Sequence, residues 1–456
     1  MNALKQNYGL LLVLVAFLSP SSLASVTVSL DEPNWSFTLK QPLGDTARPR
    51  VNRQEGEFFS QVQKDLDAQN YTAVITAFDA FAKAQEQISP MLHEMMGQVF
   101  LSAKQNEQAK QHFLAALKKG PSMPAAQRGL SMIYMLEQNY AKAREHLSQA
   151  LILGMTDSQM YGQLGYLNLQ LEHPRSAIAA YQNAMMLDID NNQWKQGLLF
   201  ALIASDALPQ ARSLADEMLA AQPDDRRLWL QRSQIAMKAG DDVTAISSLE
   251  TAVSLGEKNV ANLVMLTKLH VRSGSPHRAV TLLKTHAGSL LASGKDGSDA
   301  ILSIGNWLVA NQDWQNLSVL VEVSDSHSEA FSSASKAALN VMKANLAMAK
   351  QQITNAQKYL LSALKTSPAN GDALLTLAGL LRQQNKDERA KMYYLRAEAL
   401  PDYKTRAVLG RAQIAINQRS YAEALTLLRQ VYKDNPSRND LLSNIQSLEN
   451  IVNNAS

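Results

Sequence analysis

The residues that could support metal binding or catalysis are few and dispersed. The one local group of histidines is His270, His277 and His286, and a metal site would require these three side chains to converge from two neighbouring helices. His270 falls at a predicted helix-packing position and His277 in a predicted turn, so we expect no metal site. His93-Glu94 lacks the second histidine that a zinc-protease helix needs.

Other catalytic patterns are missing from the sequence. It contains no cysteine, which excludes disulfides, thiolate zinc sites and cysteine nucleophiles. It also contains no Gly-x-Ser-x-Gly elbow, no phosphate-binding loop and no dinucleotide-binding fingerprint. The acidic pairs Asp224-Asp225 and Asp241-Asp242 lie at predicted turns, where carboxylates commonly cap helices. We therefore predict a protein that is not an enzyme and that uses no cofactor.

The composition favours a folded protein without a nucleic-acid partner. Of the 456 residues, 46% are apolar and 19% are charged, which is enough apolar material for an extensive core. Lys and Arg number 44 against 41 Asp and Glu, and the cations form no run longer than a pair. A nucleic-acid interface normally concentrates its basic residues in one patch, so we predict none.

The N-terminus has the pattern of a secretory signal peptide over residues 1–24. A short cationic start is followed by the apolar run Leu10–Leu18 and by small residues that predict cleavage between Ala24 and Ser25. The run is too short to span a bilayer, and no later stretch comes closer, so we expect no transmembrane segment. Because no cysteine follows the cleavage site, the protein is not expected to be a lipoprotein. An exported chain of this size without cysteine suits the bacterial periplasm.

Residues 25–53 differ from everything that follows. Apolar and polar residues alternate over 26–30 and again over 35–39, with turn-forming residues between them, which predicts a β-hairpin. Residues 40–53 are rich in proline and arginine and predict an extended tether. A hairpin alone is marginally stable, so it needs a surface to cover. Either it caps the first helical repeat, or it pairs with a partner protein.

From about residue 55 the apolar residues follow the helical period of 3.6, and a period of 34 residues is superimposed on it. In each unit a small residue is usually followed after 12 residues by Ala, after 4 more by an aromatic residue or Leu, and after 3 more by Ala. Gly97, Ala109, Phe113 and Ala116 show this pattern, and Pro121 completes it. Small residues let helices approach closely while the larger residue fills the space beside them.

This pattern resembles the tetratricopeptide-repeat family, whose unit is a pair of antiparallel helices. The resemblance implies an all-α, right-handed superhelical solenoid of about eleven helix-turn-helix repeats, preceded by the short N-terminal β-hairpin or extended segment. The expected repeats span residues 55–89, 90–123, 124–157, 158–191, 192–225, 226–259, 260–293, 298–331, 337–370, 371–404 and 405–438.

The repeats are expected to form two arrays. Seven lie in residues 55–293 and three in 337–438, with an irregular repeat and flanking insertions in 294–336 and a capping helix in 439–456. The insertions either form a hinge between the arrays or are surface loops that leave the helix stacking intact.

In the tetratricopeptide family, positions 2, 5, 9, 12 and 13 of the first helix line a concave groove. Mapped onto this sequence, these positions hold seven cations and two acids, so the predicted groove is basic. The cations are Arg128, Arg227, Lys238, Lys268, Arg272, Arg382 and Arg406, and the acids are Glu94 and Asp372. The candidate partner groove consists of Arg128, Met132, Tyr166, Gln196, Phe200, Arg227, Gln234, Lys238, Lys268 and Arg272.

A basic groove that also carries amide, methionine and aromatic side chains suits a protein partner that presents an acidic and apolar peptide or helix. An anionic polysaccharide would use the same cations and rings. The carboxylate clamp of chaperone-binding family members is not matched, since Arg128 is followed by Met132 and Asn345 is preceded by Val341. The sequence thus predicts a non-enzymatic periplasmic scaffold that binds a protein in cell-envelope assembly. The alternative is an adaptor for exopolysaccharide synthesis or export.

Overall fold

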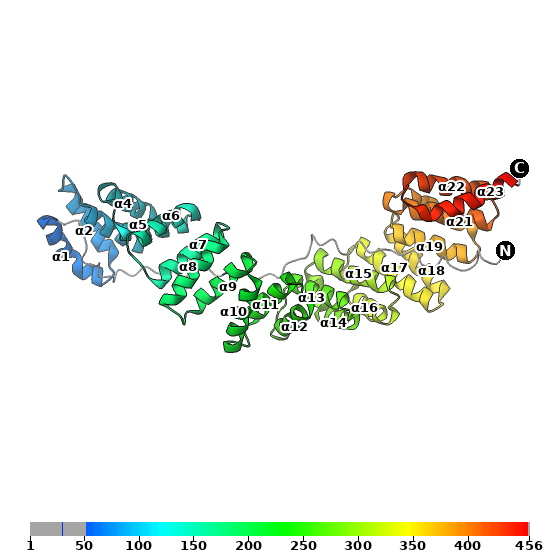
Figure 1. The fold of residues 1–456 in the computed structure, drawn as a ribbon, viewed down its shortest axis with the longest axis horizontal. Coiled ribbons are helices and arrows are strands. Elements are labelled where there is room, and N and C mark those ends of the chain that lie inside the picture. Colours follow the sequence, from blue (N-terminus) through cyan, green and yellow to red (C-terminus); the bar gives the residue numbers. More distant parts are fainter. Residues whose placement is uncertain (1–29, 31–51, 455–456) are drawn as a thin grey trace. The chain divides into compact units, whose positions relative to one another are not determined.

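The computed structural model describes residue 30 and residues 52–454 (Figure 1). This part of the chain contains 23 α-helices, three short 3₁₀ helices and no strand, so the predicted all-α fold of consecutive helix pairs is confirmed. The signal peptide and most of the predicted hairpin lie outside the described residues. Leu30 is the exception, and its half-buried side chain packs against the apolar core that includes Phe58 and Phe78.

The described helices belong to two compact units, which meet in the sequence between Asp241 and Asp242. The N-terminal unit contains α1 (Arg53–Asp67), α2 (Tyr71–Lys83), α3 (Pro90–Ser102), α4 (Asn106–Lys119), α5 (Pro124–Leu136), α6 (Tyr140–Ile152), α7 (Ser158–Gln170), α8 (Pro174–Leu187), α9 (Asn192–Ala204), α10 (Leu208–Ala221) and α11 (Arg226–Lys238). The C-terminal unit contains α12 (Asp242–Ser254), α13 (Val260–Arg272), α14 (Pro276–Ala292), α15 (Lys295–Ala310), α16 (Trp314–Ser326), α17 (Ser333–Ala349), α18 (Ile353–Thr366), α19 (Gly371–Gln383), α20 (Asp387–Glu398), α21 (Lys404–Asn417), α22 (Tyr421–Asp434) and α23 (Leu442–Asn454).

Odd-numbered helices, here called A helices, alternate with even-numbered B helices. A single residue with positive φ ends each A helix and turns the chain into the B helix. In the described chain these residues are Gln69, Lys104, Gln138, Glu172, Asp206, Gly240, Gly274, Gln312, Gln351, Asn385 and Arg419. The turn is a helix C-cap: the amide of Asn139, for example, donates to the carbonyl of Tyr134 at 2.8 Å. Most of these positions hold polar residues rather than glycine, which is why the turns leave only a weak signal in the sequence.

Within each unit, B helices pack one central side chain, here called the wedge, against neighbouring A helices. Phe113 of α4 is fully buried between Gly97 of α3 and Gly129 of α5. A Cβ atom at Gly97 would lie 2.7 Å from the Phe113 ring, and one at Gly129 would lie 2.3 Å from it. The aromatic ring therefore fits only because both facing positions lack a side chain.

The same arrangement recurs, with size compensation, along both units. Tyr181 lies between Gly165 and Gly197, and a Cβ atom at either glycine would approach its ring to less than 3 Å. Tyr394 lies against Gly410 in the same way. Where the wedge side chain is smaller, the next A helix carries a larger side chain at the position equivalent to Gly129. These pairs of wedge and facing residue are Leu147 with Gln163, Ala215 with Gln231, Leu249 with Met265, and Leu360 with Thr376.

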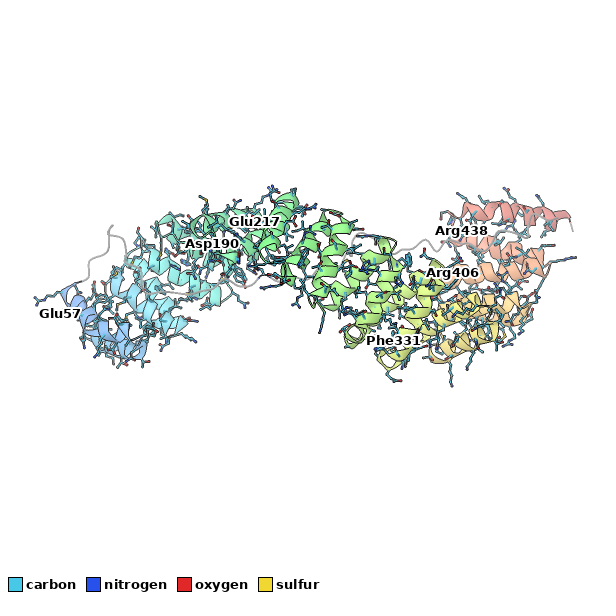
Figure 2. The ribbon with its side chains drawn as sticks, turned by 90° about the horizontal axis from the view of Figure 1, so that it is seen from below. Glu57, Asp190, Glu217, Phe331, Arg406 and Arg438 are labelled. Carbon is cyan, nitrogen blue, oxygen red and sulfur yellow. The ribbon has the colours of Figure 1, made fainter. Side chains whose placement is uncertain are left out.

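The two insertions around the irregular repeat, residues 294–297 and 332–336, lie at the starts of α15 and α17, and Ser332 caps α17. The segments just before them are packed into the C-terminal unit. The helix α14 bends at His286 and buries Leu290 and Leu291. The 3₁₀ helix η2 (Ser328–Ala330) is followed by the buried Phe331, which is labelled in Figure 2.

The wedge geometry predicts a steric penalty for any side chain at Gly129. Gly129→Ala would press a methyl group against Phe113, which Gly97 already confines on its other side, and should lower the free energy of unfolding by about 1–3 kcal/mol. Urea unfolding of the purified protein measures this change.

The matched control is Gly56→Ala in α1, where a Cβ atom would meet nothing within 4 Å. Alanine in an open helical position should leave stability unchanged or raise it by about 0.5–1 kcal/mol. Equal effects of the two substitutions would contradict the wedge model.

Candidate protein-binding surface

The predicted groove residues lie on A helices of both units. Arg128 and Met132 are on α5, Tyr166 on α7, Gln196 and Phe200 on α9, and Arg227, Gln234 and Lys238 on α11, all in the N-terminal unit. Lys268 and Arg272 are on α13 of the C-terminal unit.

The ninth residue of each A helix forms a row in the N-terminal unit. Met132, Tyr166, Phe200 and Gln234 are spaced by 34 residues on successive A helices, so they occupy the same register. Met132, Phe200 and Gln234 are partly exposed, whereas Tyr166 is only 4% exposed. The row thus offers two apolar side chains and one amide to a partner, and the Tyr166 ring belongs mainly to the core.

Several of the predicted groove cations are neutralised by acids from outside the mapped groove positions. Arg128 donates to Asp157, the N-cap of α7, at 3.0 Å, and also to Gln159 at 3.2 Å. Lys238 donates to the carbonyl of Ile203 at 3.1 Å and to Asp206 at 3.4 Å. Counting only mapped positions missed these acids because they stand at helix starts and turns.

The C-terminal unit repeats this neutralisation. Arg272 donates from Nε to Asp242, the first residue of α12, at 2.7 Å. Arg406, labelled in Figure 2, lies 3.5 Å from Asp372, which is itself one of the two mapped acids. Three of the seven mapped cations, Arg128, Lys238 and Arg272, are thus paired with acids that the seven-to-two count leaves out.

Two of the mapped cations form no ion pair with the described residues. Lys268 is exposed on α13, and Arg382 is partly buried on α19. In the part of the chain that the structure describes, no carboxylate lies within 4.0 Å of the Lys268 ammonium or of the Arg382 guanidinium.

Of the two mapped acids, Glu94 is structural. Its carboxylate is 4% exposed and accepts a hydrogen bond at 3.2 Å from the amide of Ala126, in the first turn of α5. The positive end of the helix dipole stabilises a carboxylate at this place. Glu94 therefore joins two A helices and does not face a ligand.

The histidines that sequence analysis considered do not assemble a site. His270 is buried, with Nε2 3.3 Å from Glu250, while His277 is the second residue of α14 and is exposed rather than part of a turn. Among the described residues, no three His, Asp or Glu side chains are placed to hold a metal ion.

A different histidine pair was not anticipated. Nδ1 of His93 on α3 lies 3.1 Å from Nδ1 of His112 on α4, and the His112 ring stacks on Phe100 and meets the edge of Phe78. Burial, with a smaller contribution from the charge of His93, lowers the pKa of His112 to about 4 despite the opposing charge of Asp79. Burial and the charge of Lys119 also lower the pKa of His93, against the effect of Glu55. Their separation of 19 residues spans two helices, so only the repeat register could have indicated the contact.

Comparison with known proteins agrees with this architecture. Two tetratricopeptide-repeat family models match residues 94–158 and 341–404, and residues 158–191, respectively. The chain belongs to the tetratricopeptide-repeat family. Proteins of this fold generally serve as non-catalytic scaffolds for protein interaction.

Individual relatives are distant from this tetratricopeptide-repeat protein. A BBSome complex member BBS4 homolog from Drosophila melanogaster is 24% identical over 267 residues, which are 54% of this chain and 53% of the relative. The chain thus spans about half the length of that curated relative. Likenesses this distant say nothing of what the protein binds.

Solved structures with similar folds are equally remote. YrrB, described as a tetratricopeptide-repeat protein with an unusual peptide-binding site, is 20% identical and has a TM-score of 0.38; the match covers 40% of this chain and 96% of YrrB. PilW, described as a type IV pilus biogenesis factor, is 18% identical with a TM-score of 0.34, covering 44% of this chain and 94% of PilW.

No helix in the described part of the chain is both long enough and apolar enough to cross a membrane.

The buried histidine pair predicts acid-sensitive stability. Because the folded-state pKa of His112 is below the ordinary value of 6.5, the unfolded chain binds a proton first as pH falls. The free energy of unfolding should be highest above pH 6.5, where His112 is neutral in both states, and should decline as the pH falls toward about 4. Urea unfolding at several pH values measures this decline.

His112→Gln removes the titrating ring and should flatten the pH dependence. His173→Gln, which changes an exposed histidine on the α7–α8 turn, is the control and should leave the decline in place. An unaltered pH dependence in His112→Gln would show that other groups cause the acid sensitivity.

Proposed function

We propose that this tetratricopeptide-repeat protein is a periplasmic scaffold that binds a protein partner along the A-helix face of its N-terminal unit and acts in cell-envelope assembly. The observation that supports the binding surface most directly is the row of partly exposed Met132, Phe200 and Gln234 at the same register position of α5, α9 and α11. Methionine and aromatic side chains adapt to apolar partner groups, and an amide can bond a peptide backbone.

The polar surroundings of the row fit a peptide-like ligand. Gln196, one turn before Phe200 on α9, is partly exposed, and Arg128, one turn before Met132 on α5, is held in place by Asp157 and Gln159. Cations that are already paired contribute less to capture of an anion than free ones. The N-terminal unit is thus better suited to apolar and amide contacts than to a polyanion, which favours a protein over an anionic polysaccharide.

The proposed compartment is supported by the sequence of the N-terminus. Its cationic start, apolar run and small residues have the pattern of an export signal. The mature protein should begin at Ser25 and be released with the periplasmic fraction. A mature chain that retains Met1, or that stays in the cytoplasm, would contradict this part of the proposal.

Photo-crosslinking in intact cells tests the binding surface. A photoreactive phenylalanine analogue placed at Phe200 should form an adduct with one protein, because this ring lies in the exposed row. The control carries the analogue at Gln149, an exposed residue on the B helix α6. When Met132→Ala is added to the variant that carries the analogue at position 200, the yield of the adduct should fall.

Two results would contradict the proposal. Equal adducts from the Phe200 and Gln149 positions would show that the A-helix row is not selective. An adduct with a glycan instead of a protein would favour the adaptor for exopolysaccharide synthesis or export.

A further inference from the structure

One A-helix position in the C-terminal unit departs from a rule that the other repeats follow. The twelfth residue of α19 is Arg382, whereas the equivalent residues from the second repeat onward are all apolar. These residues are Leu101, Met135, Leu169, Ile203, Met237, Val271, Val309, Met348 and Ile416. The exception places a cation where the fold otherwise uses an apolar side chain.

The surroundings of Arg382 do not compensate its charge. Its Nε atom is fully buried and has no hydrogen-bond partner, and no carboxylate of the described residues forms an ion pair with the guanidinium. On the next A helix, by contrast, Arg411 is paired with Glu398 at 2.6 Å. Arg382 does form a side-chain hydrogen bond with Tyr394, but the neutral phenol supplies no counter-charge, and a partly buried cation without one is unfavourable.

A gap lies beside this arginine. Gly379 is one helical turn before Arg382, and a Cβ atom there would meet only the hydroxyl of Tyr394, at 3.9 Å. The neighbouring A helices carry Asn345 and Gln413 at the equivalent position. Gly379 is therefore not required by close packing, unlike Gly410, where a Cβ atom would lie 2.4 Å from the Tyr394 ring.

The groups around the gap are hydrogen-bond donors. Burial raises the pKa of Tyr394 although the charge and hydrogen bond of Arg382 act in the opposite direction, so the phenol stays protonated at neutral pH. The buried Nε–H of Arg382 has no acceptor among the described residues. The residues equivalent to Arg382 on the preceding and following A helices are Met348 and Ile416. Both are half-buried, so each offers an apolar surface.

We propose that Arg382, the Tyr394 hydroxyl and the gap over Gly379 bind a carboxylate of a protein partner, presented next to an apolar side chain. The carboxylate supplies the missing charge, and it is either an Asp or Glu side chain or a chain terminus. Guanidinium and carboxylate form strong charge-assisted hydrogen bonds. The choice of a protein ligand rests on the proposed function, whereas the anion site rests on the geometry around Arg382.

Selection of short peptides displayed on phage against the immobilised mature chain tests this site. Selected peptides should contain Asp, Glu or a free carboxyl terminus beside an apolar residue. Arg382→Met, which restores the residue of the preceding repeat, should weaken binding of a selected peptide at least about ten-fold, since charge-assisted hydrogen bonds are lost. Gly379→Gln, which fills the gap with the side chain of the following repeat, should have the same effect.

Arg406→Met is the matched control, because Arg406 is exposed on the next A helix and is already paired with Asp372. It should leave peptide binding unchanged. Synthesis of one selected peptide as the terminal acid, the terminal amide and a Glu→Gln variant distinguishes a terminal from a side-chain carboxylate.

Urea unfolding separates binding from a structural role. If Arg382 serves a ligand, Arg382→Met should unfold at an equal or higher urea concentration than the wild type. Lower stability of this variant, selected peptides without a carboxylate, or binding unaffected by Arg382→Met would each overturn the proposal. So would a uronic-acid oligosaccharide that binds more tightly than any selected peptide and depends on Arg382. Crosslinking at Phe200 can succeed or fail independently, because it tests the N-terminal unit.

Discussion

The fit between each B-helix wedge and the two A helices beside it determines the structure of both units. At Phe113 and Tyr181 an aromatic ring occupies a full helix crossing, and glycine stands on each side of it. Where the wedge is leucine or alanine, the facing A helix carries glutamine, methionine or threonine. Close packing leaves little tolerance for another distribution of volume, so each crossing fixes how far one repeat is displaced from the next.

This constraint explains why the A helices can present a regular surface. Because the repeats within residues 90–293 and within 337–438 keep the 34-residue register, the ninth and twelfth residues of their A helices recur at equivalent positions, and a change at one such position stands out. Tyr166 shows the limit of the rule, since a residue in the row can be large enough to become part of the core. Gly379 and Arg382 are exceptions of another kind. Gly379 leaves a gap and Arg382 introduces a cation at positions where helix packing requires neither.

Much of the fold could be predicted from the sequence because the residue types themselves show where small and large side chains alternate at helix crossings. The period of 34 and the small residues around Phe113 indicate helix pairs without any knowledge of distances. The charge of the binding surface could not be predicted in this way. Asp157, Asp206 and Asp242 are outside the mapped positions, and only the three-dimensional turn geometry brings them to Arg128, Lys238 and Arg272. The contact between His93 and His112, and the burial of Phe331, likewise depend on side-chain directions that periodicity does not define.

The central claim, that wedge and facing residue are matched in volume, is tested most directly by a double-mutant cycle at Tyr181 and Gly197. Urea unfolding would give the free energies of the wild type, Gly197→Ala, Tyr181→Leu and the double variant. A leucine wedge leaves room for a side chain at position 197, so Gly197→Ala should be less destabilising in the leucine background than in the wild type, with a coupling energy of about 0.5–3 kcal/mol. Additive effects of the two substitutions would contradict the account.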